Sequence, residues 1–249
     1  MNKKIESQLF FTKEGNGNDV LFLHGWGCSG TIFCSLLSRL KDYTTILVDM
    51  WGFGNTPLPE EANSGWSAVD YAHKIAQFII NNNLTNLTVV GHSFGGRVGI
   101  VLASEYPDLV KKLVLVSSAG LKRFNLKKSL KIMRYKYLKR RSTTNEKFLK
   151  KLKEKGSDDF KACNNALKPT FLKVVNQSLE SYAPRIKCST LLIWGQKDKE
   201  TPLWMAKRFK KLIPKSGLVI MKNCGHYCFL ENSNLFIAVL KSFLNSEEE

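Results

Sequence analysis

"VVGHSFGGRVGI" (residues 89–100) sets a serine between two glycines, after a run of β-branched residues and before a helix-forming run. A strand, then G-H-S-F-G, then a helix is the pattern of a nucleophile elbow. The turn is so tight that Ser93 must adopt a strained backbone, while Gly91 and Gly95 leave no side chains to clash. Such a turn lifts the serine hydroxyl to the C-terminal edge of a sheet. A plain glycine-rich turn is the alternative, and the flanking strand and helix argue against it.

Short apolar runs alternate with longer helical patterns along the chain. The strand-like runs cover residues 20–24, 44–49, 87–91, 112–118, 190–195 and 217–222. The helical patterns include residues 68–81, 97–106 and 203–212. Continuous apolar strands imply a sheet covered on both faces, and the helices supply the crossovers that parallel strands require. We therefore predict an α/β fold with a doubly wound, mostly parallel sheet, preceded by one antiparallel strand whose turn holds Asn16 and Gly17.

The alternation of strand and helix breaks once, between residues 121 and 187. No strand-like run occurs there, and apolar residues recur at helical spacing, beginning with Leu126, Leu130, Met133 and Tyr137. We predict that residues 121–187 form a helical cap on the sheet edge where the strands end. The cap would separate two parts of one core, residues 1–120 and 188–249. No linker or repeat indicates an independent domain.

The excess positive charge is concentrated in the predicted cap. The chain has a net charge of +17, and residues 121–187 hold 20 Lys and Arg against 5 Asp and Glu, so 15 of the 17 excess charges lie there. A cationic entrance would attract an acidic acyl carrier protein, an anionic membrane surface or a small carboxylate substrate. A solvated lysine-rich face is the alternative. No nucleic acid partner is expected, because no recognition fold or stacking platform is evident.

The ends of the chain and its cysteines bear on location and metal binding. The first residues lack a secretory signal, and no apolar run approaches the roughly 18 residues of a membrane span, so we expect a cytoplasmic location. The six cysteines are then expected to be reduced. Cys224 and Cys228 flank His226, but their spacing does not fit a zinc site and no second ligand pair is present. We expect neither a metal nor a cofactor.

A serine nucleophile needs a histidine base, and the chain has four histidines. His92 adjoins Ser93 but is expected to point to the other side of the elbow. His73 lies within a predicted helix, and His24 ends a strand, where it would shape the loop. His226, in "NCGHYCFLE", follows a strand at the same sheet edge, so we predict it as the base. A surface histidine in a glycine turn is the alternative.

The carboxylate that orients the base should follow Ser93 and precede His226 in the chain. Asp198, in "IWGQKDKETP", comes a few residues after a strand and would lie at the same edge. Its rivals end the helix after the elbow, lie in the cap, or come two residues later: Glu105, Asp108, Asp158, Asp159 and Glu200. The loop at residues 117–120 holds no acid. We predict Asp198 as the acid of a Ser-His-Asp triad.

Attack on a carbonyl also needs donors for the developing oxyanion, and loss of one donor costs roughly 3 kcal/mol of barrier. The backbone N–H of Phe94, directly after the serine, is one predicted donor. The backbone N–H of Trp26, in a glycine-rich loop after a strand, is the other. The Trp26 indole, Cys28 and Tyr227 are predicted to line the substrate pocket. Simple packing is the alternative for the indole.

Five motifs together carry a family resemblance that covers nearly the whole chain. "HGWG", "DMWGFGNT", "GHSFGG", "IWGQKD" and "GHYCFLE" stand in the order and at the spacing of the α/β-hydrolase superfamily, which this sequence resembles. The resemblance implies an eight-stranded sheet with the cap inserted after the sixth strand. It also implies Ser93 as nucleophile, Asp198 as acid, His226 as base, and the amides of Trp26 and Phe94 as the oxyanion hole.

The resemblance also narrows the expected chemistry. A serine at the elbow disfavours the dehalogenase and epoxide hydrolase branches, which use aspartate there. The chain looks most like a small carboxylesterase, and "HGWG" is similar to the pimeloyl-[acyl-carrier-protein] methyl ester esterases, although those have tryptophan where this chain has His92. We expect hydrolysis of an ester or thioester through an acyl-enzyme. A carbon–carbon hydrolase or an acyltransferase on the same triad, or a non-catalytic ligand-binding protein, are the alternatives.

Overall fold

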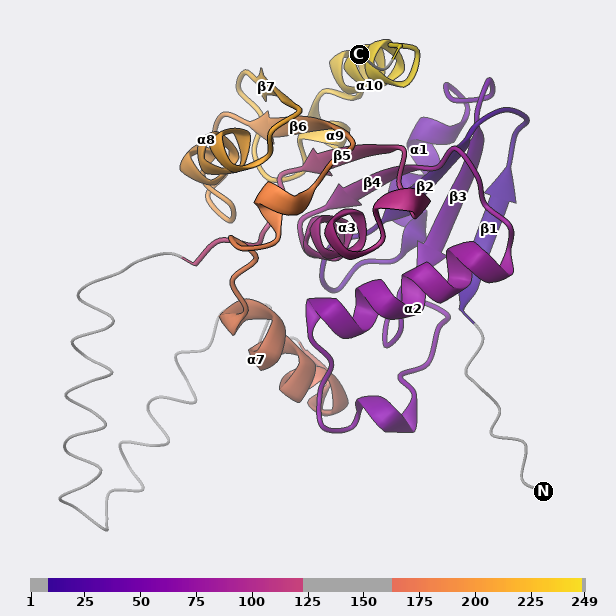
Figure 1. Cartoon of the computed structure of the whole chain (residues 1–249), viewed down its shortest axis with the longest axis vertical. Coiled ribbons are helices and arrows are strands. Elements are labelled where there is room, and N and C mark those ends of the chain that lie inside the picture. Colours follow the sequence, from indigo (N-terminus) through magenta and orange to yellow (C-terminus); the bar gives the residue numbers. More distant parts are fainter. Residues whose placement is uncertain (1–8, 123–162, 248–249) are drawn as a thin grey trace, which may run out of the picture.

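The computed structural model describes residues 9–122 and 163–247, and in this part of the chain the sheet has seven strands. They are β1 (Phe10–Glu14), β2 (Asp19–Leu23), β3 (Thr44–Asp49), β4 (Thr88–His92), β5 (Lys112–Val116), β6 (Ser189–Gly195) and β7 (Ser216–Met221). Their order across the sheet is β1-β3-β2-β4-β5-β6-β7 (Figure 1). Every neighbouring pair is parallel except β1 and β3. The predicted mostly parallel sheet and its antiparallel first strand are confirmed.

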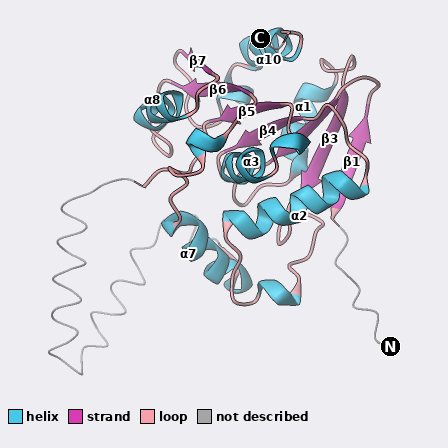
Figure 2. Ribbon diagram, in the orientation of Figure 1, coloured by secondary structure: helices cyan, strands magenta, loops and turns pink. Residues whose placement is uncertain are grey.

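Helices cover both faces of this sheet (Figure 2). The longer ones are α2 (Ala68–Asn81), α3 (Phe94–Glu105), α7 (Lys168–Asn176), α8 (Leu203–Leu212) and α10 (Ser233–Leu244), and the short ones are α1 (Cys34–Leu37) and α9 (Cys228–Glu231). Single 3₁₀ turns occur at Gly30–Phe33, Glu60–Ala62, Pro107–Leu109, Asn165–Leu167 and Ala183–Arg185. None of the helices described is both long and apolar enough to cross a membrane.

The strands form two hydrophobic cores because successive side chains point to opposite faces of the sheet. In β2, Leu21 and Leu23 join the core under α2, α3 and α8, whereas Val20 and Phe22 join the core under α1, α9 and α10. Burial on both faces explains why the strand sequences are continuously apolar rather than alternating. The doubly wound α/β class predicted from those runs is confirmed.

The predicted strand count and the position of the cap need correction. We expected eight strands and an insertion after the sixth, but in the described part of the chain the insertion follows β5, the fifth of seven strands. The eighth strand came from the family pattern, whereas the sequence itself holds seven strand-forming runs. Residues 123–162, most of the predicted cap, lie outside the described residues. The boundaries of the cap therefore stay a prediction.

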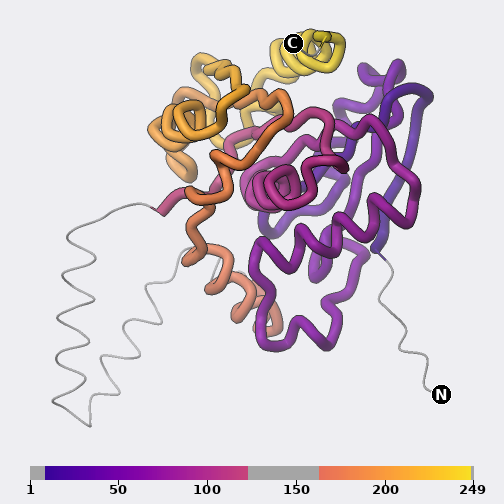
Figure 3. Tube along the Cα trace, viewed as in Figure 1, coloured from indigo at the N-terminus to yellow at the C-terminus, as the bar shows by residue number. Residues whose placement is uncertain are grey.

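The described end of the predicted cap packs on the first half of the core. The Thr170 hydroxyl in α7 accepts a hydrogen bond from the backbone N–H of Trp66 at 2.9 Å, and Lys173 Nζ donates to the Gly65 carbonyl at 2.6 Å. Figure 3 shows these segments, distant in sequence, side by side below α2. Ser67, next to them, caps α2 together with Asp70, which is why that helix begins at its predicted residue.

Two buried polar side chains at strand ends hold the loops of the C-terminal edge together. The Asp49 carboxylate, at the end of β3, accepts a hydrogen bond from the Gly30 N–H at 2.7 Å. His24, just after β2, donates from Nδ1 to the Gly25 carbonyl at 2.8 Å and accepts at Nε2 from the Met50 N–H at 3.0 Å. The expectation that His24 shapes its loop is confirmed.

The stability of the fold should depend on the titration of His24. Burial lowers the pKa of its imidazole from 6.5 to about 4. The unfolded chain therefore binds one more proton than the folded chain between these values, so stability falls as the pH drops through that window. Urea unfolding of the wild type and of His24→Gln should therefore differ in pH dependence. Between about pH 7 and about pH 4.5, the free energy of unfolding of the variant should fall by about 2 kcal/mol less than that of the wild type. An identical pH dependence would contradict the assigned neutral imidazole.

Candidate active site

Ser93 lies in the turn between β4 and α3 with a strained backbone. Its φ is +51° and its ψ is −104°, a conformation that residues with a side chain rarely adopt. The Ser93 N–H donates to the Val116 carbonyl at 3.1 Å, and the Ser93 carbonyl accepts from the Ala119 N–H at 3.1 Å. The strain predicted from the sequence is present, and backbone hydrogen bonds to the end of β5 and the loop after it maintain it.

The two glycines of the elbow allow backbone atoms to pass at close range. A Cβ on Gly95 would lie 2.0 Å from the Leu23 carbonyl oxygen, and a Cβ on Gly91 would lie 2.6 Å from the Gly95 carbonyl oxygen. The Gly95 N–H donates to the His24 carbonyl at 3.0 Å. A side chain on Gly95 would push the elbow away from β2, and one on Gly91 would push the start of α3 away from β4, so the role predicted for these glycines is confirmed.

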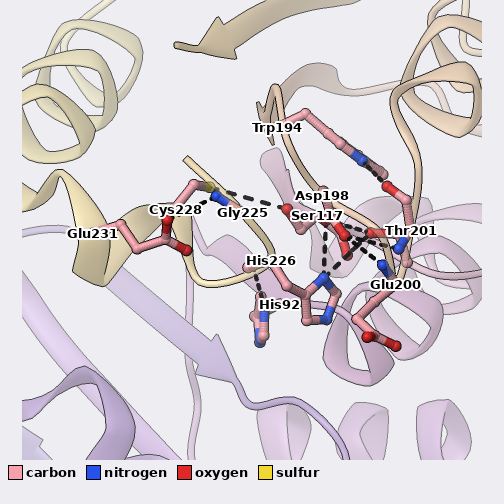
Figure 4. Close-up of polar contacts among 10 residues, drawn as sticks. All are labelled: His92, Ser117, Trp194, Asp198, Glu200, Thr201, Gly225, His226, Cys228 and Glu231. Carbon is pink, nitrogen blue, oxygen red and sulfur yellow. Dashed lines mark hydrogen bonds and ion pairs between the residues drawn. The ribbon is translucent and has the colours of Figure 1, made fainter. Parts of the chain in front are cut away.

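Loops after β6 and β7 bring Asp198 and His226 together at the same edge. His226 Nδ1 lies 2.9 Å from Asp198 Oδ2, with the Asp198 side chain fully buried and the His226 side chain 14% exposed (Figure 4). An ionised carboxylate can only accept, so Nδ1 carries a proton, and in the neutral imidazole Nε2 then keeps its lone pair. This is the tautomer that a general base requires. The pairing predicted from chain order is present.

The Asp198 carboxylate is held by further donors from its own loop. Oδ1 accepts from the N–H groups of Glu200 and Thr201, both at 2.9 Å, and Oδ2 lies 2.8 Å from the Thr201 hydroxyl. Burial alone would raise the pKa of Asp198, but hydrogen bonds from His226 and Thr201 outweigh it and the pKa lies below its ordinary value. The carboxylate therefore stays ionised and can stabilise an imidazolium.

Thr201 is a site residue that the sequence reasoning missed. Besides Asp198, its hydroxyl oxygen lies 3.0 Å from the Ser117 carbonyl and 3.4 Å from His226 Nδ1. It is buried, and it comes three residues after the acid and just before α8. An acid followed at that spacing by threonine, directly before a helix, is a local hydrogen-bonding pattern that could have identified it.

His92 contacts the proposed base, which the sequence did not suggest. We expected it to point to the other side of the elbow, which no contact in the described part of the chain contradicts, but the sequence did not indicate that its ring centroid lies 4.8 Å from that of His226 and its Nε2 3.1 Å from the His226 carbonyl oxygen. Alternation along β4 puts residues 90 and 92 on the face covered by α9 and α10, and the loop after β7 crosses that face. His73, by contrast, lies on α2 and pairs with Glu105 at 3.2 Å, as its helical position implied.

The two predicted oxyanion donors belong to segments that touch the elbow. Phe94 is the first residue of α3, so its N–H has no hydrogen-bond acceptor within that helix. Trp26 lies in a turn closed by a bond from the Cys28 N–H to the Gly25 carbonyl at 3.2 Å. A Cβ on Gly25 would be 3.6 Å from Ser93 Cβ, so this turn packs directly beside the serine. The arrangement can offer two backbone amides next to one nucleophile.

The predicted pocket residues border this site. The half-buried Trp26 indole makes edge contacts with three phenylalanine rings at centroid distances of 5.0 to 5.3 Å: Phe53, Phe94 and Phe171. Phe171 comes from α7, so the described part of the predicted cap contributes to this aromatic cluster. Cys28 is half-buried in the same turn as Trp26, and Tyr227, 39% exposed, follows His226. The ring contacts of Trp26 are compatible with both packing and pocket lining, so its role in the pocket stays a prediction.

Comparisons with known proteins agree with this fold. The sequence model of the family described as "alpha/beta hydrolase fold" matches residues 19–159, more than half of the chain. Lipase 1 of Psychrobacter immobilis is 28% identical to this chain, over 90% of this chain and 76% of the lipase. The pimeloyl-[acyl-carrier protein] methyl ester esterase of Wigglesworthia glossinidia brevipalpis is also 28% identical, over 95% of this chain and 97% of the esterase. An esterase structure from Exiguobacterium antarcticum superimposes with a TM-score of 0.75 at 23% identity, covering 96% of both chains. The chain belongs to the α/β-hydrolase family.

Proposed function

We propose that this hydrolase cleaves a carboxylic ester or thioester through an acyl-enzyme, with Ser93 as nucleophile, His226 as base and Asp198 as acid. The observation that carries the proposal is the 2.9 Å contact between His226 Nδ1 and Asp198 Oδ2 at the sheet edge where the strained Ser93 stands. The lipase and methyl ester esterase relatives support an ester substrate. The backbone amides of Trp26 and Phe94 are proposed to bind the oxyanion.

The proposed reaction has two halves that use the same base. His226 Nε2 takes the Ser93 proton as Oγ forms a bond to the substrate carbonyl carbon, and the carbonyl oxygen becomes negative beside the two amides. The imidazolium, stabilised by Asp198, then protonates the departing alkoxide or thiolate. In the second half, His226 removes a proton from water as the water oxygen attacks the acyl carbon. Release of the carboxylic acid returns the proton to Ser93.

The surroundings of Ser93 favour an apolar acyl group. The aromatic cluster of Trp26, Phe53, Phe94 and Phe171 lies around the turn that carries one of the proposed oxyanion amides. Of these rings only that of Trp26 is half-buried, and an aromatic surface suits hydrocarbon chains, because apolar surface gains by leaving water. We propose that Trp26, Cys28 and Tyr227 contact the substrate beside the reacting carbonyl.

The positive charge of the protein suggests what kind of molecule would carry such an acyl group to the site. Residues 121–187 hold 15 of the 17 excess positive charges. The exposed face of α8 adds Lys207, Arg208 and Lys211, and no Asp or Glu occurs between residues 201 and 230. We propose that the natural acyl donor is anionic, such as an acyl chain on an acidic carrier protein, because opposite charge speeds encounter.

Ser93→Ala should abolish hydrolysis if Ser93 is the nucleophile. Loss of the attacking hydroxyl is expected to lower kcat on a short-chain p-nitrophenyl ester by about 10⁴-fold or more. A fluorophosphonate probe should label the wild type at Ser93, as read by peptide mass spectrometry, and should leave the variant unlabelled. A folded wild type that neither hydrolyses esters nor takes up the probe would favour the non-catalytic alternative.

The Thr201 hydroxyl should matter to catalysis through the acid rather than through substrate binding. Thr201→Val keeps the shape but removes one hydrogen bond to Asp198, so we expect kcat to fall about fivefold to tenfold with KM changed less than about twofold. Thr201→Ser restores a hydroxyl and should recover most of the rate. Steady-state kinetics on one ester measures all three proteins. Equal kcat for the valine and wild-type enzymes would show that the hydroxyl does not support the acid.

An anionic acyl donor should make the rate depend on salt. We expect kcat/KM on an acidic acyl carrier ester to fall about tenfold or more between about 0.05 M and about 0.5 M NaCl, since salt screens the attraction. The rate on a neutral p-nitrophenyl ester of the same chain length should change less than about twofold and serves as the control. Equal salt dependence for both substrates would argue for a basic surface with no role in recognition.

A further inference from the structure

We propose that His92 is a positioning residue: its imidazole fixes the backbone of residue 226 and thereby the base that serves the neighbouring Ser93. This inference rests on the proposed function, because it assigns a role toward the proposed triad. The proposal is based on one partly buried hydrogen bond between segments separated by 134 residues in sequence, from His92 Nε2 to the His226 carbonyl at 3.1 Å (Figure 4).

The direction of this bond follows from its partners. A backbone carbonyl can only accept, so His92 Nε2 carries the proton and donates it. The donor, His92, is fully buried and the acceptor residue, His226, is half-buried, so bulk water competes little for this hydrogen bond. Its ring is also packed against the His226 ring at 4.8 Å, with the planes tilted by 53°. One side chain therefore contacts both the carbonyl and the imidazole of the proposed base.

The bond joins two parts of the site that otherwise come from separate loops. His92 is covalently attached to Ser93, whose backbone is fixed by the elbow, while His226 lies in the loop after β7. Asp198 holds the His226 ring at Nδ1, and His92 holds the His226 backbone. With both ends restrained, the distance between the nucleophile and Nε2 of the base is set by the fold rather than by the loop. Such restraint is what acyl transfer needs, since misplacement of about 1 Å can cost 10²-fold in rate.

The unused nitrogen of His92 supports the assignment. No residue in the described part of the chain donates to His92 Nδ1, which is buried beside Gly25, where a Cβ would approach it to 2.9 Å. A buried acceptor without a partner costs stability, and a phenylalanine ring would pack between Tyr227 and Phe229 without that cost. The donor at Nε2 is therefore what histidine adds at this position.

The environment also keeps this donor uncharged. Burial first, and then the charge of the neighbouring His226 ring, lower the pKa of His92 to about 3; the hydrogen bond to the His226 carbonyl and the charge of Asp198 act in the opposite direction, and His24 lowers it slightly further. A neutral donor holds the carbonyl without placing a second positive charge beside an imidazole that must become positive during the reaction. A lysine or arginine could donate the same bond but would oppose that step.

Two variants at one position separate hydrogen bonding from packing. His92→Phe keeps a flat ring and removes the donor, and we expect kcat to fall about tenfold with KM changed less than about twofold. His92→Gln carries an amide nitrogen three bonds from Cβ, as Nε2 is, and should keep most of the wild-type kcat. The free energy of unfolding of each protein is measured by urea titration, so that loss of rate can be compared with loss of stability.

The ¹H NMR resonance of the proton between His226 Nδ1 and Asp198, downfield of the amide region, gives a measurement that does not depend on turnover. It should broaden or move in His92→Phe and stay close to its wild-type position in His92→Gln. An unchanged resonance together with unchanged kcat in His92→Phe overturns the positioning role. The positioning role is also overturned if kcat falls equally in His92→Phe and His92→Gln and the fall parallels the loss in their free energies of unfolding. A wild type with this resonance but without hydrolysis or labelling of Ser93 overturns the proposed function instead.

Discussion

The backbone of Gly95 packs on the end of β2 with no room for a side chain, since a Cβ there would meet the Leu23 carbonyl oxygen at 2.0 Å. Its N–H donates to the His24 carbonyl, so α3 starts directly against the loop that carries Trp26. Because of this contact, only Ser93 connects the end of β4 to the start of α3, and its φ is +51° as a result. The serine, the first amide of α3 and the glycine-rich turn are therefore one rigid unit.

The rest of the site reaches this unit because parallel strands end at the same edge of a sheet. The loops after β6 and β7 carry Asp198 and His226 to the edge where the elbow stands, although more than a hundred residues separate them from Ser93. The acid is fixed by donors from its own loop, chiefly the backbone of residues 200 and 201. His92 then connects the elbow to the loop of the base by a partly buried hydrogen bond.

The sequence was sufficient for those features that depend on position along the chain. Strand ends and chain order were enough to pair Asp198 with His226 and to place both at the edge of Ser93, and continuous apolar runs predicted the doubly wound sheet. Features that depend on where a side chain points were missed. Thr201 was missed although its spacing from the acid is a local signal, whereas the contact of His92 with His226 depends on the path of the loop after β7, which no local pattern encodes. The eighth strand was expected from the family resemblance alone.

The crystal structure of a phosphonate ester bound to the protein tests the central claim most directly, because a phosphonyl group mimics the tetrahedral intermediate of acyl transfer. The account predicts a covalent bond from phosphorus to Ser93 Oγ, a phosphonyl oxygen within hydrogen-bonding distance of the Trp26 and Phe94 amide nitrogens, and His226 Nε2 next to the Oγ atom. A phosphonate attached to another residue, or one on Ser93 whose oxygen faces away from both amides, would contradict it.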